Sequence, residues 1–98
     1  MNQRRKLTDE EIHQELSQLP GWRLTDDGKI ARDFKLKDFK AALGFIVRIG
    51  LASEAMDHHP EIFNVYSTVK IALNTHDAQG LTALDFQLAR QIDAQIQG

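Results

Sequence analysis

The stretch between residues 37 and 56 constrains the fold of this chain more than any other. It contains no proline, it is rich in helix-forming residues, and Asp38 near its start suits the positive end of a helix dipole. Its apolar residues are Phe39, Ala41, Ala42, Leu43, Phe45, Ile46, Val47, Ile49, Leu51, Ala52, Ala55 and Met56. These are too many for the single apolar stripe of a surface helix, and a chain of 98 residues cannot bury a helix on every side. We therefore expect one long helix, part of whose surface meets another subunit.

The bulk composition excludes several classes of protein. The 98 residues suit one domain spanning 1–98, with a flexible segment expected at 1–6. The net charge is -2, and the longest basic block is Arg4-Arg5-Lys6, so no nucleic-acid or anionic membrane partner is expected. The chain has no cysteine, no apolar run near the ~20 residues of a membrane span, and no hydrophobic signal segment at its start. These features predict a cytoplasmic protein.

The first third of the chain predicts a helix followed by a hairpin. Thr8 and Glu11 have the spacing of a capping box, so a helix should begin at Asp9 and continue until Pro20-Gly21. Residues 22–34 then form two short alternating runs around Asp26-Asp27-Gly28, where Asp-Gly favours a tight turn.

The remainder predicts a second hairpin and a last helix. Residues 62–66 and 69–76 are β-prone, with a turn expected at Ser67-Thr68. Thr82 then caps a final helix with Asp85 at its third position. The order α-β-β-α-β-β-α predicts an α+β fold, in which three helices pack on one face of a four-stranded antiparallel sheet.

Three histidines converge in this arrangement, beginning with the stretch EAMDHHPEIFNVY. Glu54 and His58 are four residues apart and would share one helix face, whereas Pro60 forces His59 out of the helical region. His76 ends the second strand of a hairpin that starts just after this pair. Because both ends of an antiparallel hairpin lie at one end of the sheet, the three imidazoles should lie close together.

Such a cluster can both donate and accept protons near neutral pH. Asp57, Asp77 and Glu54 are candidates to orient the rings or to hold a cationic edge of a substrate. The alternative is structural, because a histidine at a helix end can stabilise the helix dipole and acidic residues there can be solvated charges. Spacing alone leaves both readings open.

Tyr66 and Asp85 also have two readings each. Tyr66 could stack on a planar ligand or simply pack on the sheet, and Asp85 is explained by capping alone.

A metal site is the rival interpretation of the cluster, because three imidazoles and a carboxylate could hold zinc or iron. The adjacent pair His58-His59 has poor chelating geometry, and the helical spacings His-x-x-x-His and Glu-x-x-His are absent. We therefore expect no metal.

The same residues resemble the pterin-4a-carbinolamine dehydratase family, also known as the dimerisation cofactor of a homeodomain transcription factor. The likeness runs from about Trp22 to Asp93. Its core is an acidic residue four before His-His-Pro, an aromatic six after the proline, Thr-His ten further on and an aspartate nine after that. Glu54, His58, His59, Pro60, Tyr66, His76 and Asp85 fill these places in register.

The resemblance implies dehydration of 4a-hydroxytetrahydropterin to quinonoid dihydropterin, which recycles the cofactor of aromatic amino acid hydroxylases. It implies no metal and no prosthetic group, and it implies homodimers or homotetramers, for which the 37–56 helix offers a surface. It makes His58 and His76 the proton-transfer residues, with His59 beside them as an alternative acid. Glu54, Asp57, Pro60, Tyr66, Asp77 and Asp85 are the implied residues around the substrate.

One position departs from the family pattern, and one alternative function stays open. Ile62 stands two residues after Pro60, where many family members have a tryptophan, so an aromatic wall beside the pterin is missing. The alternative is a non-catalytic oligomeric scaffold or coactivator on the same fold.

Overall fold

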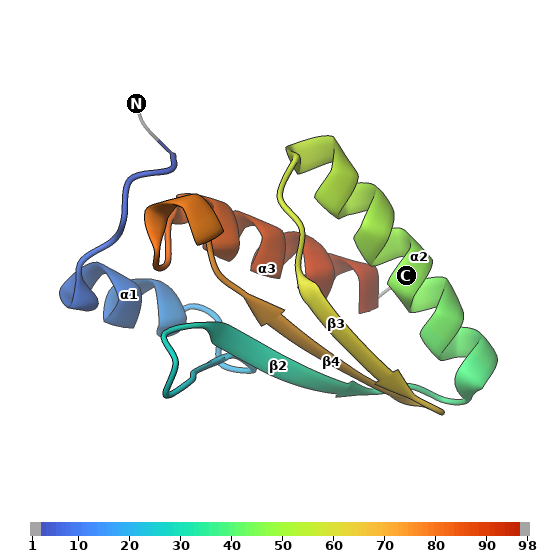
Figure 1. Cartoon of the computed structure of the whole chain (residues 1–98). Helices are drawn as coiled ribbons and strands as arrows, with labels where there is room; N and C mark the ends of the chain where they lie inside the picture. The colour runs from blue at the N-terminus through green and yellow to red at the C-terminus, as the bar shows by residue number, and fades with distance from the viewer. Residues whose placement is uncertain (1–2, 97–98) are drawn as a thin grey trace.

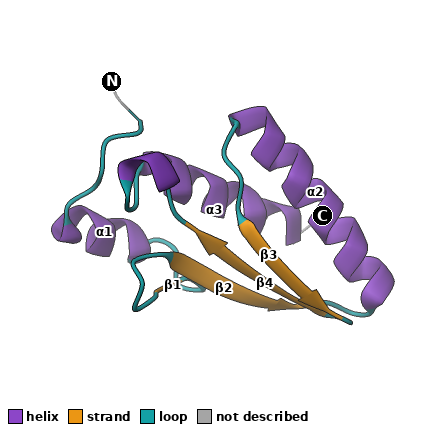
Figure 2. Ribbon diagram, in the orientation of Figure 1, coloured by secondary structure: helices purple, strands orange, loops and turns teal. Residues whose placement is uncertain are grey.

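The computed structural model describes residues 3–96 and has the predicted order of elements. The helices are α1 (Asp9–Leu16), α2 (Phe39–Met56) and α3 (Ala83–Ile96), and the strands are β1 (Arg23–Leu24), β2 (Ile30–Lys35), β3 (Glu61–Val65) and β4 (Thr68–Leu73). A short 3₁₀ helix, η1 (His76–Ala78), lies between β4 and α3 (Figure 2). The predicted α+β class and the α-β-β-α-β-β-α order are confirmed.

The four strands form one antiparallel sheet in the order β1-β2-β4-β3. β2 and β4 are central, and their register pairs Ile30 with Leu73 and Lys35 with Thr68. β3 is an edge strand that pairs only with β4 among the described residues. Figure 1 shows α2 and α3 along one side of this sheet.

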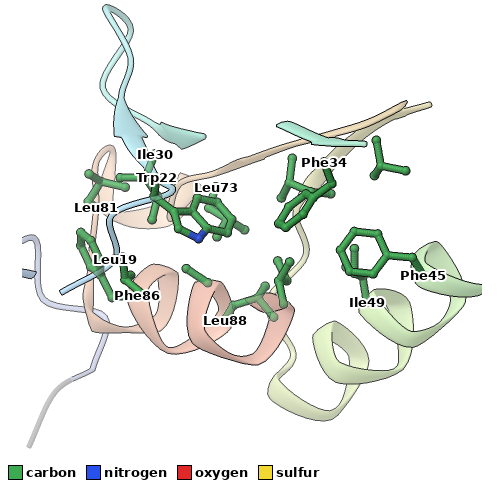
Figure 3. Packing of buried hydrophobic residues seen from close by; sticks show 14 of the residues in the cluster. Leu19, Trp22, Ile30, Phe34, Phe45, Ile49, Leu73, Leu81, Phe86 and Leu88 are labelled. Carbon is green, nitrogen blue, oxygen red and sulfur yellow. The ribbon is translucent and has the colours of Figure 1, made fainter. Parts of the chain in front are cut away.

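The core lies between the sheet and the helices (Figure 3). Phe34 of β2 stacks edge-on against Phe45 of α2, with ring centroids 4.9 Å apart. Trp22 lies next to Phe34, and its indole Nε1 donates to Asp93 of α3 at 3.0 Å. Ile12 of α1 belongs to the same buried cluster, so all three helices contribute to one core.

The helix starts follow their capping residues. Both hydrogen bonds of the predicted Thr8–Glu11 capping box are present, so α1 begins at Asp9 as expected. α2 begins at Phe39 because the Asp38 side chain accepts a hydrogen bond from the Ala41 amide at 2.8 Å. The expected helix end at Pro20 is wrong, because α1 ends at Leu16.

The turn between β3 and β4 lies one residue earlier than expected. Val65 pairs with Thr68, so Tyr66 and Ser67 form the two-residue turn. Tyr66 has a φ of 50°, and the side-chain amide of Asn64 stabilises the turn by donating to the carbonyls of Tyr66 and Thr68. The expected turn at Ser67-Thr68 is therefore wrong.

One side of α2 remains uncovered. Its buried residues are Ala42, Phe45, Ile49 and Ser53. Its exposed apolar residues recur every four positions, and their exposed fractions are 46% for Phe39, 45% for Leu43, 60% for Val47 and 68% for Leu51. Successive fourth residues form a ridge along a helix, so these four side chains make one continuous apolar ridge.

Within residues 3–96, no helix is both long enough and apolar enough to cross a membrane. Residues 1–2 of the expected flexible N-terminal segment lie outside the described part of the chain.

Candidate active site

A pocket of about 360 Å³ opens where β3 begins and β4 ends. Its lining residues are Arg4, Asp57, His58, His59, Glu61, Asn74, Thr75, His76 and Asp77. Three histidines and two of the predicted acidic residues are thus brought into one pocket. The hairpin topology expected from the sequence accounts for this, because Glu61 at the start of β3 pairs with Ala72 near the end of β4.

The end of α2 directs His58 inward. Asp57 takes the left-handed conformation with a φ of 50° and caps the helix, and the His58 amide then donates to the carbonyl of Ser53 at 3.0 Å. The chain therefore turns sharply after Met56, and the His58 residue is only 6% exposed. Its ring Nε2 lies 2.6 Å from the carboxylate Oδ1 of Asp85.

Asp85 is completely buried in the first turn of α3. Its other oxygen, Oδ2, accepts hydrogen bonds from the hydroxyl of Thr75 at 2.8 Å and from the amide of Thr82 at 2.9 Å. The hydroxyls of Thr75 and Thr82 lie 2.7 Å apart. A buried carboxylate with three donors is well satisfied, so the network can hold an ionised Asp85.

This network fixes the proton on His58. Because an ionised carboxylate only accepts hydrogen bonds, Nε2 of His58 must carry the proton that is donated to Asp85. The other ring nitrogen, Nδ1, has no hydrogen-bond partner among residues 3–96. His58 lines the pocket, and with its proton on Nε2 it has an unprotonated Nδ1 and a ring held in place by Asp85.

His59 lies on the solvent side and has a different partner. Its Nε2 lies 2.8 Å from Oε1 of Glu54, and both side chains are exposed. Glu54 was expected to share a face with His58, yet it contacts His59 and does not line the pocket. Glu54 is therefore placed to orient the His59 ring.

His76 and Asp77 reach the pocket on η1. The loop that carries them is closed by backbone bonds between Thr75 and Gly80, with the Thr75 amide 2.9 Å from the Gly80 carbonyl. Gln79 takes a φ of 55° at the end of η1 and so allows the chain to turn back. Both His76 and Asp77 are exposed, so their side chains can meet a ligand directly.

Five residues singled out in the sequence do not line the pocket: Glu54, Pro60, Ile62, Tyr66 and Asp85. Tyr66 stands in the turn at the opposite end of β3 and is 63% exposed. Pro60 is half-buried beside the pocket, and Ile62 lies two residues further on in β3, opposite Ile71. Within one chain, Tyr66 and Ile62 therefore do not contribute a wall to this pocket.

Four lining residues were not singled out in the sequence: Arg4, Glu61, Asn74 and Thr75. Glu61, Asn74 and Thr75 flank the predicted histidines, so the hairpin register carried a signal for them. No sequence signal pointed to Arg4, because its position at the pocket depends on how the N-terminal segment packs against a loop about 70 residues away in the sequence.

Among residues 3–96 there is no group of three or more histidine, cysteine, aspartate or glutamate side chains arranged to hold a metal ion.

Comparison with known proteins identifies the family of this chain. The family model described as pterin 4 alpha carbinolamine dehydratase matches residues 5–95. A protein of Rhodopseudomonas palustris (strain BisB18), provisionally named pterin-4-alpha-carbinolamine dehydratase, is 50% identical over 91 residues, which cover 92% of this chain and 90% of the relative. A protein of Solibacter usitatus (strain Ellin6076) with the same provisional name is 48% identical over 89 residues, covering 91% and 93% of the two chains.

A solved structure shares the fold. The crystal structure of a transcriptional coactivator/pterin dehydratase from Brucella melitensis matches with a TM-score of 0.89 and 43% identity, and the match covers 92% of this chain and 97% of that one. The α+β fold is thus shared with a protein described as a pterin dehydratase, and dehydratases are hydro-lyases. The chain belongs to the pterin 4 alpha carbinolamine dehydratase family.

Proposed function

We propose that this protein is a dehydratase that converts 4a-hydroxytetrahydropterin into quinonoid dihydropterin and water. The observation that carries the proposal is the pocket in which His58, fixed by buried Asp85, lies with His59 and His76. Membership of the family supports the choice of a pterin as substrate. In this role the protein would recycle the cofactor of aromatic amino acid hydroxylases.

The reaction needs one base and one acid. The base removes the proton from N5 of the pterin, the N5–C4a double bond forms, and the C4a–O bond breaks as the acid protonates the departing hydroxyl to give water. Each such proton transfer contributes about 10²–10⁴-fold to a rate. No oxidant or reductant is required, because the electrons of the N–H bond become those of the new double bond.

His58 suits the part of the base. Its Nε2 proton is held by Asp85, so Nδ1 is free to accept the N5 proton, and Asp85 then stabilises the imidazolium that forms. His76 is exposed at the pocket and suits the part of the acid, since it can regain its proton from water after each turnover. His59, held by Glu54, is the alternative acid.

The acidic residues of the pocket suit the edge of the pterin that carries its amino group and ring N–H. Asp57 and Asp77 both line the pocket, and carboxylates accept hydrogen bonds from the amino group and ring N–H of a pterin. They also stabilise the positive charge that develops on the ring as the hydroxyl leaves.

We further propose that the protein is a homodimer or homotetramer that associates through α2. The ridge of Phe39, Leu43, Val47 and Leu51 supports this, because four large apolar side chains along one helix are each 45% exposed or more. A second copy presents the same ridge, and two such ridges can pack against each other's grooves.

The proposal is tested by measuring the dehydration of 4a-hydroxytetrahydropterin with wild type and with the variant carrying both His58→Ala and His76→Ala. We expect wild type to accelerate the reaction and the double variant to lose at least about 10²-fold. If the folded double variant matches wild type, the chemistry does not belong to these histidines. That result would favour the non-catalytic scaffold, for which the exposed α2 ridge would be the working surface.

A further inference from the structure

The N-terminal segment packs against the loop that carries His76 and Asp77. The Leu7 amide donates to the carbonyl of Leu81 at 2.8 Å, which joins the segment to the end of this loop. Lys6 lies over Gly80 so closely that a Cβ on Gly80 would come within 2.7 Å of Lys6 Cε. In Figure 1 the N-terminal stretch rises beside the loop before α3. These contacts place the segment before α1 next to the candidate active site.

Arg4 belongs to this segment and lines the pocket. The next residue, Arg5, does not line it, and its guanidinium forms a two-bond ion pair with Glu11 at 2.8 and 3.1 Å. Two adjacent arginines therefore have different tasks. Arg5 ties the segment to α1, and Arg4 is one of the residues that line the pocket.

The charged residues that line the pocket indicate which group of a ligand Arg4 can bind. The lining carboxylates are those of Asp57, Glu61 and Asp77, and Glu61 is paired with Lys29 at 2.6 Å. Within residues 3–96, Arg4 is the only lysine or arginine in the lining. A pterin edge carries hydrogen-bond donors at its amino group and N3, which suit carboxylates, and an acceptor at the 4-carbonyl oxygen, which suits a guanidinium.

We propose that Arg4 is a substrate-binding residue that donates hydrogen bonds to the acceptor edge of the pterin ring. This inference rests on the proposed pterin dehydratase function. Arg4 then positions the ring opposite the carboxylates of Asp57 and Asp77 and takes no part in moving protons.

The test is steady-state kinetics on the full chain with three variants: Arg4→Ala, Arg4→Lys and Arg5→Ala. Loss of one hydrogen bond to a charged donor at an open pocket should raise the KM of Arg4→Ala about tenfold and leave kcat within about twofold. Arg4→Lys should recover part of the affinity, because it keeps the charge and loses the planar fork. Arg5→Ala should keep the KM of wild type, since the Leu7–Leu81 bond still holds the segment.

Binding of a stable dihydropterin to the same proteins, measured by calorimetry, separates this inference from the proposed function. A wild type that binds the dihydropterin about tenfold more tightly than Arg4→Ala supports the role of Arg4 even if dehydration is not accelerated. An active wild type whose KM is unchanged in Arg4→Ala overturns the role of Arg4 and leaves the function standing. An equal rise of KM in Arg5→Ala also overturns it, because the effect would then belong to the segment as a whole.

Discussion

The buried link between Asp85 and His58 makes a sharp prediction for the substitution Asp85→Asn. The carboxylate accepts from three donors: His58 Nε2, the Thr75 hydroxyl and the Thr82 amide. An amide has one oxygen. If that oxygen keeps the bonds from Thr75 and Thr82, its NH₂ group faces His58 Nε2, which must then accept. The proton of His58 moves to Nδ1, and the base that faces the pocket is lost.

The expected effect on the rate is large and the effect on stability moderate. Loss of the base should lower kcat by about 10²–10⁴-fold. Replacing the charged acceptor should reduce the free energy of unfolding by about 2 kcal/mol, because hydrogen bonds to charged groups contribute about 1.5–3 kcal/mol. For a domain of this size that corresponds to a fall in Tm of about 10 °C.

The assay compares initial dehydration rates below the melting transition with Tm from circular dichroism. Asp93→Asn is a matched control, because Asp93 is also on α3 and accepts from Trp22 and Arg32 away from the pocket. It should lower Tm and keep kcat. In addition, ¹⁵N chemical shifts of the His58 ring should show the Nε2–H form in wild type and the Nδ1–H form in Asp85→Asn. A folded Asp85→Asn protein with wild-type kcat and an unchanged His58 tautomer would refute the reasoning.

Two further predictions concern stability and assembly. The hydrogen bonds from Arg5, and then from Thr8, lower the pKa of Glu11 from 4.5 to about 2, so its stabilising effect is complete above about pH 4.5 and is lost as the pH falls towards 2. The Tm difference between wild type and Glu11→Gln should therefore shrink between pH 6 and pH 2, and an equal difference at both pH values would contradict this assignment. Val47→Glu places a charge in the α2 ridge and should reduce the mass measured by light scattering to that of a smaller assembly or monomer. The control Gln91→Glu, at an exposed position of α3, should leave the mass unchanged. An unchanged mass for Val47→Glu would exclude the ridge as the interface.

Local signals in the sequence predicted most of the fold. The Thr8–Glu11 box set the start of α1, and Gly28, with a φ of 80°, closes the predicted turn after Asp26-Asp27. Boundaries were missed where a specific contact decided them. The hydrogen bonds from the Asn64 side chain to the Tyr66 and Thr68 carbonyls stabilise the second turn at Tyr66-Ser67. The periodicity of the sequence does not reveal these bonds.

The sequence predicted which histidines meet at the site, but it did not predict the hydrogen bonds that hold them. Hairpin topology was enough to bring His76 to His58 and His59. The bond between His58 and Asp85 joins residues 27 apart and depends on the left-handed turn at Asp57, so the sequence pattern around Asp85 indicated only a capping role. Arg4 shows the same limit, because only the packing of the N-terminal segment against the 75–81 loop places it at the pocket.

The most direct test of the central claim is the rate of 4a-hydroxytetrahydropterin dehydration, followed by the absorbance of the quinonoid product, with wild type and His58→Ala side by side. His58→Ala keeps the backbone bond to Ser53 and removes the base, so we expect acceleration by wild type and a loss of about 10²–10⁴-fold in the variant. Wild type that does not exceed the uncatalysed rate, or a folded His58→Ala variant as fast as wild type, would contradict the account.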